Sequence, residues 1–216
     1  MVDPARLSRS LTEALAPLGL QIMGSAPLSP EDGLTPFRSL ALIGPDDAAF
    51  WPVFSTSPEA DDGAPDPMDR WSRRVLTPLA KAFDGQALFP FGGAPYHPFY
   101  SWALRSGRFW ASPIGFLVHA EAGLFASFRG ALALRTVLDL PAAPRPCDSC
   151  AGQLCRSACP VGAFADGYDV DACKAHLHRP EGADCMALGC RARRACPVGQ
   201  GRRLPAQSAF HMKAFR

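Results

Sequence analysis

Cysteine is the residue type whose spacing in this chain most clearly indicates chemistry. The first 146 residues contain no cysteine, and the remainder contains eight, in two groups. The first group is Cys147-x2-Cys150-x4-Cys155-x3-Cys159-Pro160, and the second is Cys173 followed by Cys185-x4-Cys190-x5-Cys196-Pro197. Both groups end in the same five residues, Ala-Cys-Pro-Val-Gly. Closely spaced cysteines that end in a Cys-Pro pair are typical of proteins that bind iron–sulfur clusters through thiolates.

The presence of two groups allows each cluster to take ligands from both. In bacterial ferredoxins, three closely spaced cysteines bind one [4Fe–4S] cluster, and the cysteine before proline binds the other cluster. A short loop can place three thiolates around one side of a cluster, whereas the fourth iron faces a distant segment. This crossed pattern predicts a first cluster bound by Cys147, Cys150, Cys155 and Cys196, and a second cluster bound by Cys159, Cys173, Cys185 and Cys190.

Zinc and disulfides are the alternatives for the same thiols. Two structural zinc sites would also use eight thiolates, but only Cys147 and Cys150 have the C-x2-C spacing that zinc favours, and zinc gives no reason for a duplicated Cys-Pro. The N-terminal stretch has no apolar run of signal-peptide length, and no stretch approaches the roughly 18 apolar residues of a membrane helix. We therefore expect a cytoplasmic protein without a membrane segment, in which clustered thiols are more often metal ligands than disulfides.

Charge and proline content divide the chain into two parts. The net charge is only +2, so the composition demands no strongly charged partner. Residues 1–140 carry 11 Lys/Arg and 14 Asp/Glu, whereas residues 141–216 carry 11 and 6. The sequence PAAPRP at 141–146 is typical of a joint between modules. Two domains are therefore predicted, residues 1–140 and residues 141–216.

The first domain is predicted to contain both helices and adjacent strands. Asp3 can cap a helix that begins at Pro4 and places leucines on one face, and a second helix begins at Pro67. Strands are predicted at 20–24, 39–44 and 87–91, and a short helix at 97–107. Residues 115–119 and 124–138 are predicted to form a hairpin or two adjacent strands. Residues 58–67 are predicted to form an exposed polar loop. This mixture favours an α+β layer fold with a largely antiparallel sheet.

The segment SPIGFLVHAEAGLFASFRGALALRTVLDLP (112–141), with the cysteine groups behind it, resembles epoxyqueuosine reductases and reductive dehalogenases. The resemblance covers residues 95–200, and the isolated Cys173 in DACKAHL matches an isolated cysteine of those families. It implies a nitroreductase/CblC-like α+β domain, of which the first 95 residues share only the general plan, followed by a ferredoxin-like module with two [4Fe–4S] clusters. By analogy alone it also implies cobalamin as a cofactor.

The chain differs from this family in the segment that would supply the catalytic acid. The proton donor of epoxyqueuosine reductases is acidic, but residues 94–115 contain no Asp or Glu. Tyr96 or Tyr100 near Arg105 could donate a proton instead, since a phenol donates well beside a cation. The bulky side chains of 99–110 are expected to narrow any cofactor cavity, so we expect epoxyqueuosine reduction to be absent. Three of the cysteine loops are also two residues longer than in the family.

Several polar residues in the cysteine-rich part invite separate interpretations. His176 and His178 could replace a thiolate, but eight cysteines suffice for two clusters, so we expect both in a solvated loop. The arginines after the last cysteines can balance the negative charge of a cluster, or form a docking patch for an acidic redox partner or an RNA such as tRNA; they are Arg191, Arg193, Arg194, Arg202 and Arg203. No aromatic residue lies between these arginines in the sequence, so they are only a weak indication of nucleic-acid binding.

Three functions follow in order of preference. The first is a ferredoxin-like electron-transfer protein that exchanges electrons with an unidentified redox partner. The second is an iron–sulfur oxidoreductase whose α+β domain binds cobalamin or another organic cofactor. The third is a non-redox protein whose metal sites are structural.

Overall fold

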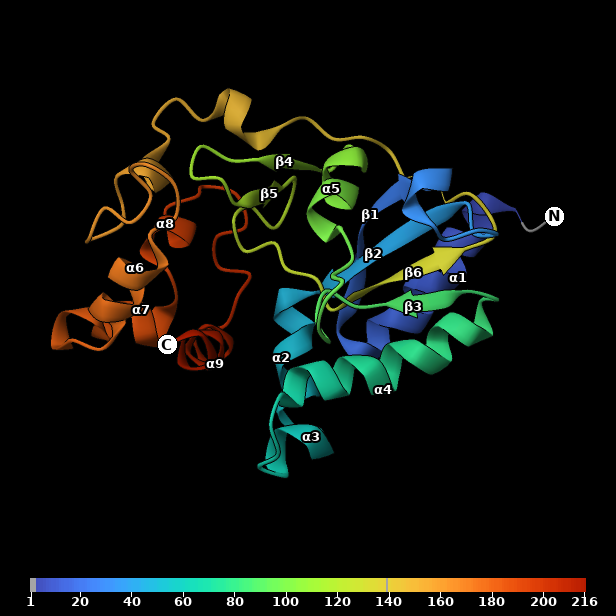
Figure 1. Cartoon of the computed structure of the whole chain (residues 1–216), viewed down its shortest axis with the longest axis horizontal. Helices are drawn as coiled ribbons and strands as arrows, with labels where there is room; N and C mark the ends of the chain where they lie inside the picture. Colours follow the sequence, from blue (N-terminus) through green and yellow to red (C-terminus); the bar gives the residue numbers. More distant parts are fainter. Residues whose placement is uncertain (1–2, 139) are drawn as a thin grey trace. The chain divides into compact units, whose positions relative to one another are not determined.

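The computed structural model describes residues 3–138 and 140–216, which divide into two compact units (Figure 1). The first comprises residues 1–108 and 127–143, and the second comprises residues 109–126 and 144–216. The last crossing between them, at 143/144, lies close to the joint predicted from the prolines. Residues 109–126 belong to the second unit, which the sequence did not indicate, because Ile114, Val118 and Leu124 share a hydrophobic core with Cys155 and Phe164.

The first unit contains a four-stranded antiparallel sheet in the order β1-β2-β6-β3. The strands are β1 (Leu20–Pro27), β2 (Ser39–Pro45), β3 (Gln86–Leu88) and β6 (Gly130–Leu134). Every residue of β2 and β6 is buried, as the continuous apolar run of β2 predicts. The predicted α+β class with an antiparallel sheet is therefore confirmed for this unit.

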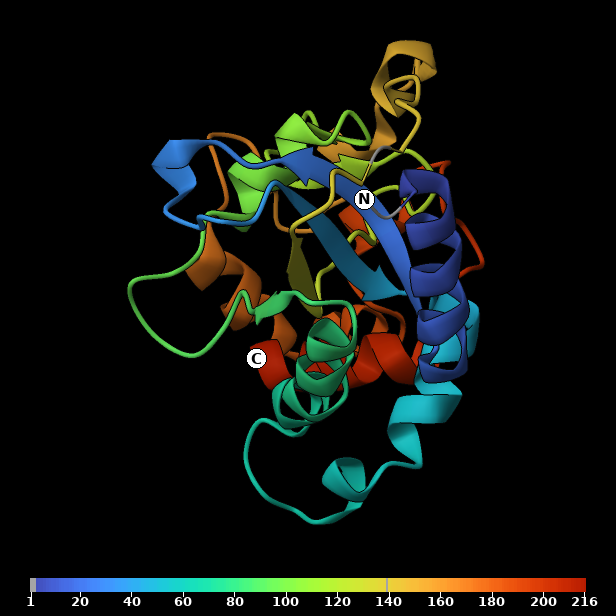
Figure 2. The same ribbon diagram turned by 90° about the vertical axis from the view of Figure 1, so that its right-hand side faces the viewer.

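The helices of the first unit cover the sheet. They are α1 (Pro4–Leu15), α2 (Asp47–Ser55), α3 (Pro58–Asp61), α4 (Pro67–Ala82) and α5 (Phe99–Arg105). The carboxylate of Asp3 caps α1 by accepting from the backbone N–H of Ala5 at 3.2 Å, and α1 buries Leu7, Leu11 and Leu15. Figure 2 shows α1 and α4 on the same face of the sheet.

Two local predictions were wrong. Residues 115–119 and 124–138 do not pair, because β5 (Leu117–His119) pairs with β4 (Phe109–Ala111) and β6 pairs with β2 and β3. The stretch 58–67 is not all exposed loop, because it contains α3, in which Glu59 is buried and forms an ion pair with Arg74.

Asp32 links a loop of the first unit to α5. Its carboxylate accepts from the indole N–H of Trp102 and from Arg105, both at 2.8 Å, and from the backbone N–H of Ser29 at 2.8 Å. Burial tends to raise the pKa of Asp32, but these donors outweigh it and lower the pKa from 3.8 to about 2. The folded pKa thus lies below the unfolded value, so the stabilisation is present above about pH 4 and is lost as the pH falls towards 2.

We expect Asp32→Asn to lower the free energy of unfolding by about 1–2 kcal/mol at pH 7 and to remove this acid sensitivity. Denaturant unfolding between pH 3 and pH 7, followed by tryptophan fluorescence, measures both effects. The neighbouring exposed Glu31, changed to Gln, is the control and should keep the parent profile. If Asp32→Asn lost stability between pH 7 and pH 3 as the parent protein does, the proposed role of this carboxylate would be contradicted.

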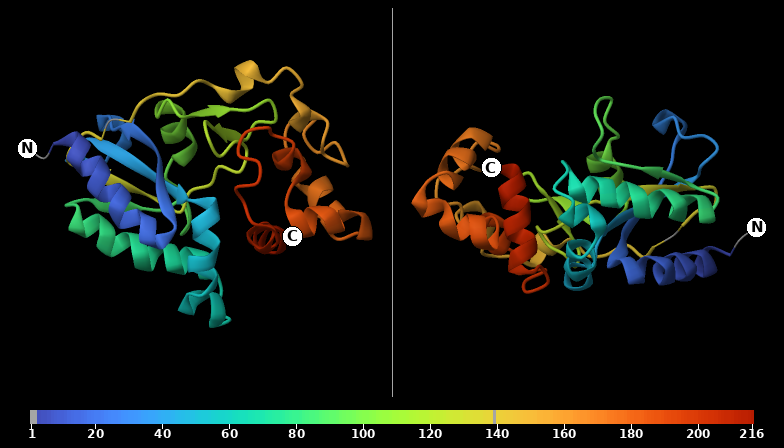
Figure 3. Two further views of the ribbon diagram at one scale, coloured as in Figure 1. Left: turned by 180° about the vertical axis from the view of Figure 1, so that it is seen from behind. Right: turned by 90° about the horizontal axis from the view of Figure 1, so that it is seen from below.

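The second unit consists of a short hairpin, 3-10 turns and short helices. Besides β4 and β5 its elements are the 3-10 turns Pro146–Ser149, Leu154–Arg156 and Pro180–Gly182, and the helices α6 (Val170–Leu177), α7 (Ala183–Leu188), α8 (Arg191–Arg194) and α9 (Pro205–Phe215). Helices α7 and α9 lie side by side in both views of Figure 3. Among the described helices of the chain, none combines the length and the apolar character needed to cross a bilayer.

Candidate metal centres

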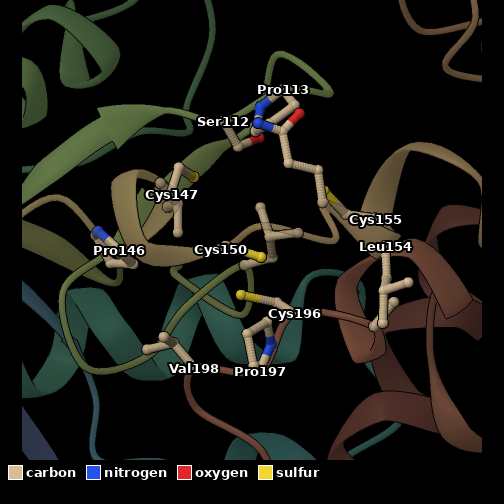
Figure 4. Close-up of a pocket in the computed structure, with 14 residues that line it drawn as sticks. Ser112, Pro113, Pro146, Cys147, Cys150, Leu154, Cys155, Cys196, Pro197 and Val198 are labelled. Atoms are coloured by element: carbon tan, nitrogen blue, oxygen red, sulfur yellow. The ribbon is translucent and has the colours of Figure 1, made fainter.

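Four cysteines line one cavity of the second unit (Figure 4). They are Cys147, Cys150, Cys155 and Cys196. The cavity holds about 370 Å³ of space not filled by atoms, including open solvent. The 3-10 turn Pro146–Ser149 supplies Cys147, the 3-10 turn Leu154–Arg156 supplies Cys155, and the segment after α8 supplies Cys196. The remaining walls are mainly apolar and include Val118, Leu124 and Val198.

The other four cysteines line a second cavity, of about 330 Å³ on the same measure. They are Cys159, Cys173, Cys185 and Cys190. Helix α6 carries Cys173, α7 carries Cys185, and Cys190 immediately precedes α8. Met212, from α9, closes part of this cavity.

The two cavities share no cysteine, and each takes one Cys-Pro cysteine from the opposite sequence group. This is the grouping that the crossed pattern predicts. That iron–sulfur clusters bind there stays a prediction, although the placement of the thiols agrees with it.

The thiols whose charges raise the pKa of Cys147, Cys155 and Cys173 line the same cavity as the thiol that they affect. Burial raises the pKa of Cys147 and Cys155, and Cys196 and Cys150 raise both further. Burial likewise raises the pKa of Cys173, to which Cys190 and Cys159 add.

All eight cysteines are free thiols, and none forms a disulfide. Within residues 3–138 and 140–216, no three His, Cys, Asp or Glu side chains form a group that could hold one metal ion. The cysteines are instead distributed around the walls of the two cavities.

Glycine allows the loop before β6 to approach Cys196. Gly123 has a φ of +56°, and a Cβ there would meet the carbonyl oxygen of Val198 and lie 3.1 Å from the Sγ of Cys196. Gly199 has a φ of +76°, and a Cβ there would meet the carbonyl oxygen of Ala122. Two glycines thus let these backbones pack directly behind a ligand of the first cavity.

We expect Gly123→Ala to destabilise the second unit and to disturb the first cavity. Gly162→Ala is the matched control, because Gly162 has a similar φ of +63° but open space around the added methyl. Both variants strain the backbone, and only Gly123→Ala overpacks, which typically costs a further 1–3 kcal/mol, to order of magnitude. Thermal unfolding and the iron content of anaerobically purified protein measure the difference. Equal losses in both variants would show that the close approach is unimportant.

Arg193 is a cation beside the second group of thiols. Its guanidinium lies 4.8 Å from the centre of the Phe116 ring, and Cys190 and Tyr168 interact with it electrostatically. Burial lowers the pKa of Arg193, and Cys190 opposes that effect. Among the described residues Arg193 forms no ion pair with a carboxylate. An anionic group bound by the neighbouring thiols would stabilise this half-buried charge.

The other four arginines of this region have partners nearby. Arg191 and Arg194 form ion pairs with Asp184, and Arg202 lies 4.0 Å from Glu121. Arg203 donates to the carbonyl oxygen of Phe125 at 2.8 Å. These contacts favour local charge balance over a free docking patch for RNA.

The prediction of solvent exposure for the two histidines between the cysteines was right for one of them and wrong for the other. His178 is exposed, as expected, but His176 is 8% exposed on α6 and lines the second cavity. Its Nε2 is buried and has no hydrogen-bond partner among the described residues. The sequence did contain a signal, because His176 follows Cys173 by three residues and a helix places both on one face.

The residues proposed as proton donors lie on α5 and in the loop before it. The side chains of Tyr96 and Tyr100 are exposed, at 68% and 45%, and Arg105 is held in its ion pair with Asp32. Within the bulky run of residues 99–110, Phe99, Trp102 and Phe109 are buried, as expected for residues that fill space.

No family model matches this chain, and none of the curated proteins is significantly similar to it.

Proposed function

We propose that the protein is an iron–sulfur electron-transfer protein whose second unit acts as a ferredoxin-like module with two [4Fe–4S] clusters. Cys147, Cys150, Cys155 and Cys196 would hold the first cluster, and Cys159, Cys173, Cys185 and Cys190 the second. The single observation that carries this proposal is the division of the eight cysteines between two cavities, four to each. When bound, each cluster would take up and release one electron.

The arrangement of the thiols supports clusters over single ions. The ligands of a zinc ion all lie about 2.3 Å from one point, whereas each iron of a [4Fe–4S] cluster takes its own thiolate at a different corner. Cysteines spread around a cavity wall suit the second geometry. The half-buried charge of Arg193 beside Cys190 supports an anionic occupant, since a cluster with four thiolates carries net negative charge.

The chain's own groups also prepare the sulfurs to bind iron. Ala163 donates its backbone N–H to the Sγ of Cys159 at 3.4 Å, and the phenol of Tyr168 forms a hydrogen bond with Cys173. Hydrogen bonds to sulfur stabilise thiolate and raise the reduction potential of a cluster. The positions of Tyr96, Tyr100 and Arg105 give no support to the alternative of a cobalamin-dependent reductase.

Metal and sulfide analysis of anaerobically purified protein tests this proposal. We expect a brown protein with about eight irons and eight acid-labile sulfides per chain. Stoichiometric zinc without sulfide would contradict it and favour structural metal sites. A co-purifying corrin or flavin, seen in the same ultraviolet–visible spectrum, would favour a reductase.

A further inference from the structure

The second cavity contains a buried polar atom that no described residue satisfies. His176 lines this cavity together with Cys159, Cys173, Cys185 and Cys190. The residue is more than nine-tenths buried, and its Nε2 has no hydrogen-bond partner among the described residues. Buried polar atoms in folded proteins are nearly always hydrogen-bonded, so an unpaired one indicates a missing partner.

The position of His176 is determined by its helix. Asp169 caps α6 by accepting from the backbone N–H of Ala172 at 2.8 Å. At the other end, Gly182 packs so closely that a Cβ there would meet the carbonyl oxygen of His176. Since His176 follows Cys173 by three residues on this helix, both side chains are on the face towards the second cavity.

We propose that His176 donates its Nε2–H to a sulfur of the cluster held by the four cysteines of the second cavity, as a positioning residue that raises the reduction potential of that cluster. This inference rests on the proposed function. In the tautomer protonated at Nε2, imidazole is a donor at this atom. Four thiols already line the cavity, so His176 acts beside the ligands and does not replace one.

The two cavities differ in the donors that they offer. In the second, the backbone N–H groups of Ala163 and Arg191 and the phenol of Tyr168 already form hydrogen bonds with Cys159, Cys185 and Cys173 respectively. In the first, the backbone of Cys155 interacts with its own sulfur. Adding His176 to the donors of the second cavity raises the potential of the second cluster, because hydrogen bonds to sulfur favour the reduced state.

Redox titration of the full-length anaerobic protein, followed by electron paramagnetic resonance, tests this role. In His176→Phe we expect both clusters to remain and one midpoint to fall. The reduced-to-oxidised ratio of that cluster should drop about tenfold at a fixed potential, which corresponds to about 59 mV for one electron. His176→Gln, which keeps an N–H donor, should recover part of the shift. His178→Phe is the matched control, since His178 is exposed two residues away, and it should move neither midpoint.

A second readout uses the parent protein labelled with ¹⁵N-histidine. Pulsed electron paramagnetic resonance should show a weak ¹⁵N coupling to one reduced cluster, which His176→Phe abolishes. A strong coupling typical of direct ligation, or unmoved midpoints with eight irons still present, would overturn the inference while leaving the proposed function intact. Parent protein without iron or sulfide would overturn both.

Discussion

Replacement of Cys196 by serine is expected to remove about half of the iron, and the site that is lost is formed mainly by cysteines about forty residues earlier in the chain. The reason is that Cys196 lines the first cavity with Cys147, Cys150 and Cys155, and not the second with its sequence neighbour Cys190. Loss of one of four thiolates leaves one iron without its protein ligand. The iron content should fall from about eight to about four per chain, with one cluster signal retained.

Pairs of substitutions distinguish crossed from uncrossed ligation. If Cys147 and Cys196 bind one cluster, the double variant with serine at both should lose no more iron than either single variant. Serine at both Cys159 and Cys196 should remove nearly all iron, because these cysteines line different cavities. If instead each cluster were bound by cysteines that are neighbours in the sequence, the double variant with serine at Cys190 and Cys196 would lose no more iron than either single variant. That result would refute the crossed arrangement.

Removal of iron is expected to unfold the second unit and leave the first folded. The hydrophobic core of the second unit includes Cys155, and other cysteines of both groups pack against it. Its helices are short, and metal binding in such small domains supplies about 10 kcal/mol or more, which is comparable to the whole stability of a domain. The first unit has its own buried sheet and contains no cysteine.

Hydrogen exchange of the same molecule with and without iron measures this effect. After anaerobic chelation, amides of α6, α7 and the hairpin β4–β5 should lose at least about 100-fold in protection, while those of β2 and β6 keep theirs. The strands of the first unit thus serve as an internal control. Reconstitution with iron and sulfide should restore the lost protection. Unchanged exchange in α6 and α7 would mean that the unit folds without metal.

Local sequence signals predicted those helices and strands that can be recognised without knowing which other elements they pack against. Asp3 before Pro4, with leucines at helical spacing, predicted α1, and the apolar run at 39–44 predicted β2. The partner of β6 could not be predicted in this way. Its apolar residues fit a hairpin with 115–119 as well as a place beside β2, and the choice depends on contacts with residues some 90 positions away. The hydrogen bond from Arg129 N–H to the carbonyl oxygen of Ile43, at 2.8 Å, leads the chain into that pairing.

The candidate site shows the same division. Cysteine spacing and the repeated Cys-Pro predict two sets of four thiols, each with three from one sequence group and one from the other, and the two cavities divide the thiols in the same way. His176 was missed because its neighbours Lys174 and His178 are polar, which favours a solvated loop when the helix is unknown. The close approach at Gly123 was also missed, since a single glycine in a sequence does not reveal which backbone will lie against it.

The chain passes between the two units three times, and this has a consequence for synthesis on the ribosome. Strand β2 pairs on one edge with β1, but its other edge waits for β6, which lies between β2 and β3 in the sheet. At about 5–20 residues per second, β6 is made roughly 4–18 seconds after β2. During that interval the second unit's hairpin has also been made, but no cysteine of either group exists yet. The nascent chain therefore carries an unpaired apolar strand edge, and a chaperone at the ribosome that shields residues 39–45 should increase the yield of folded protein.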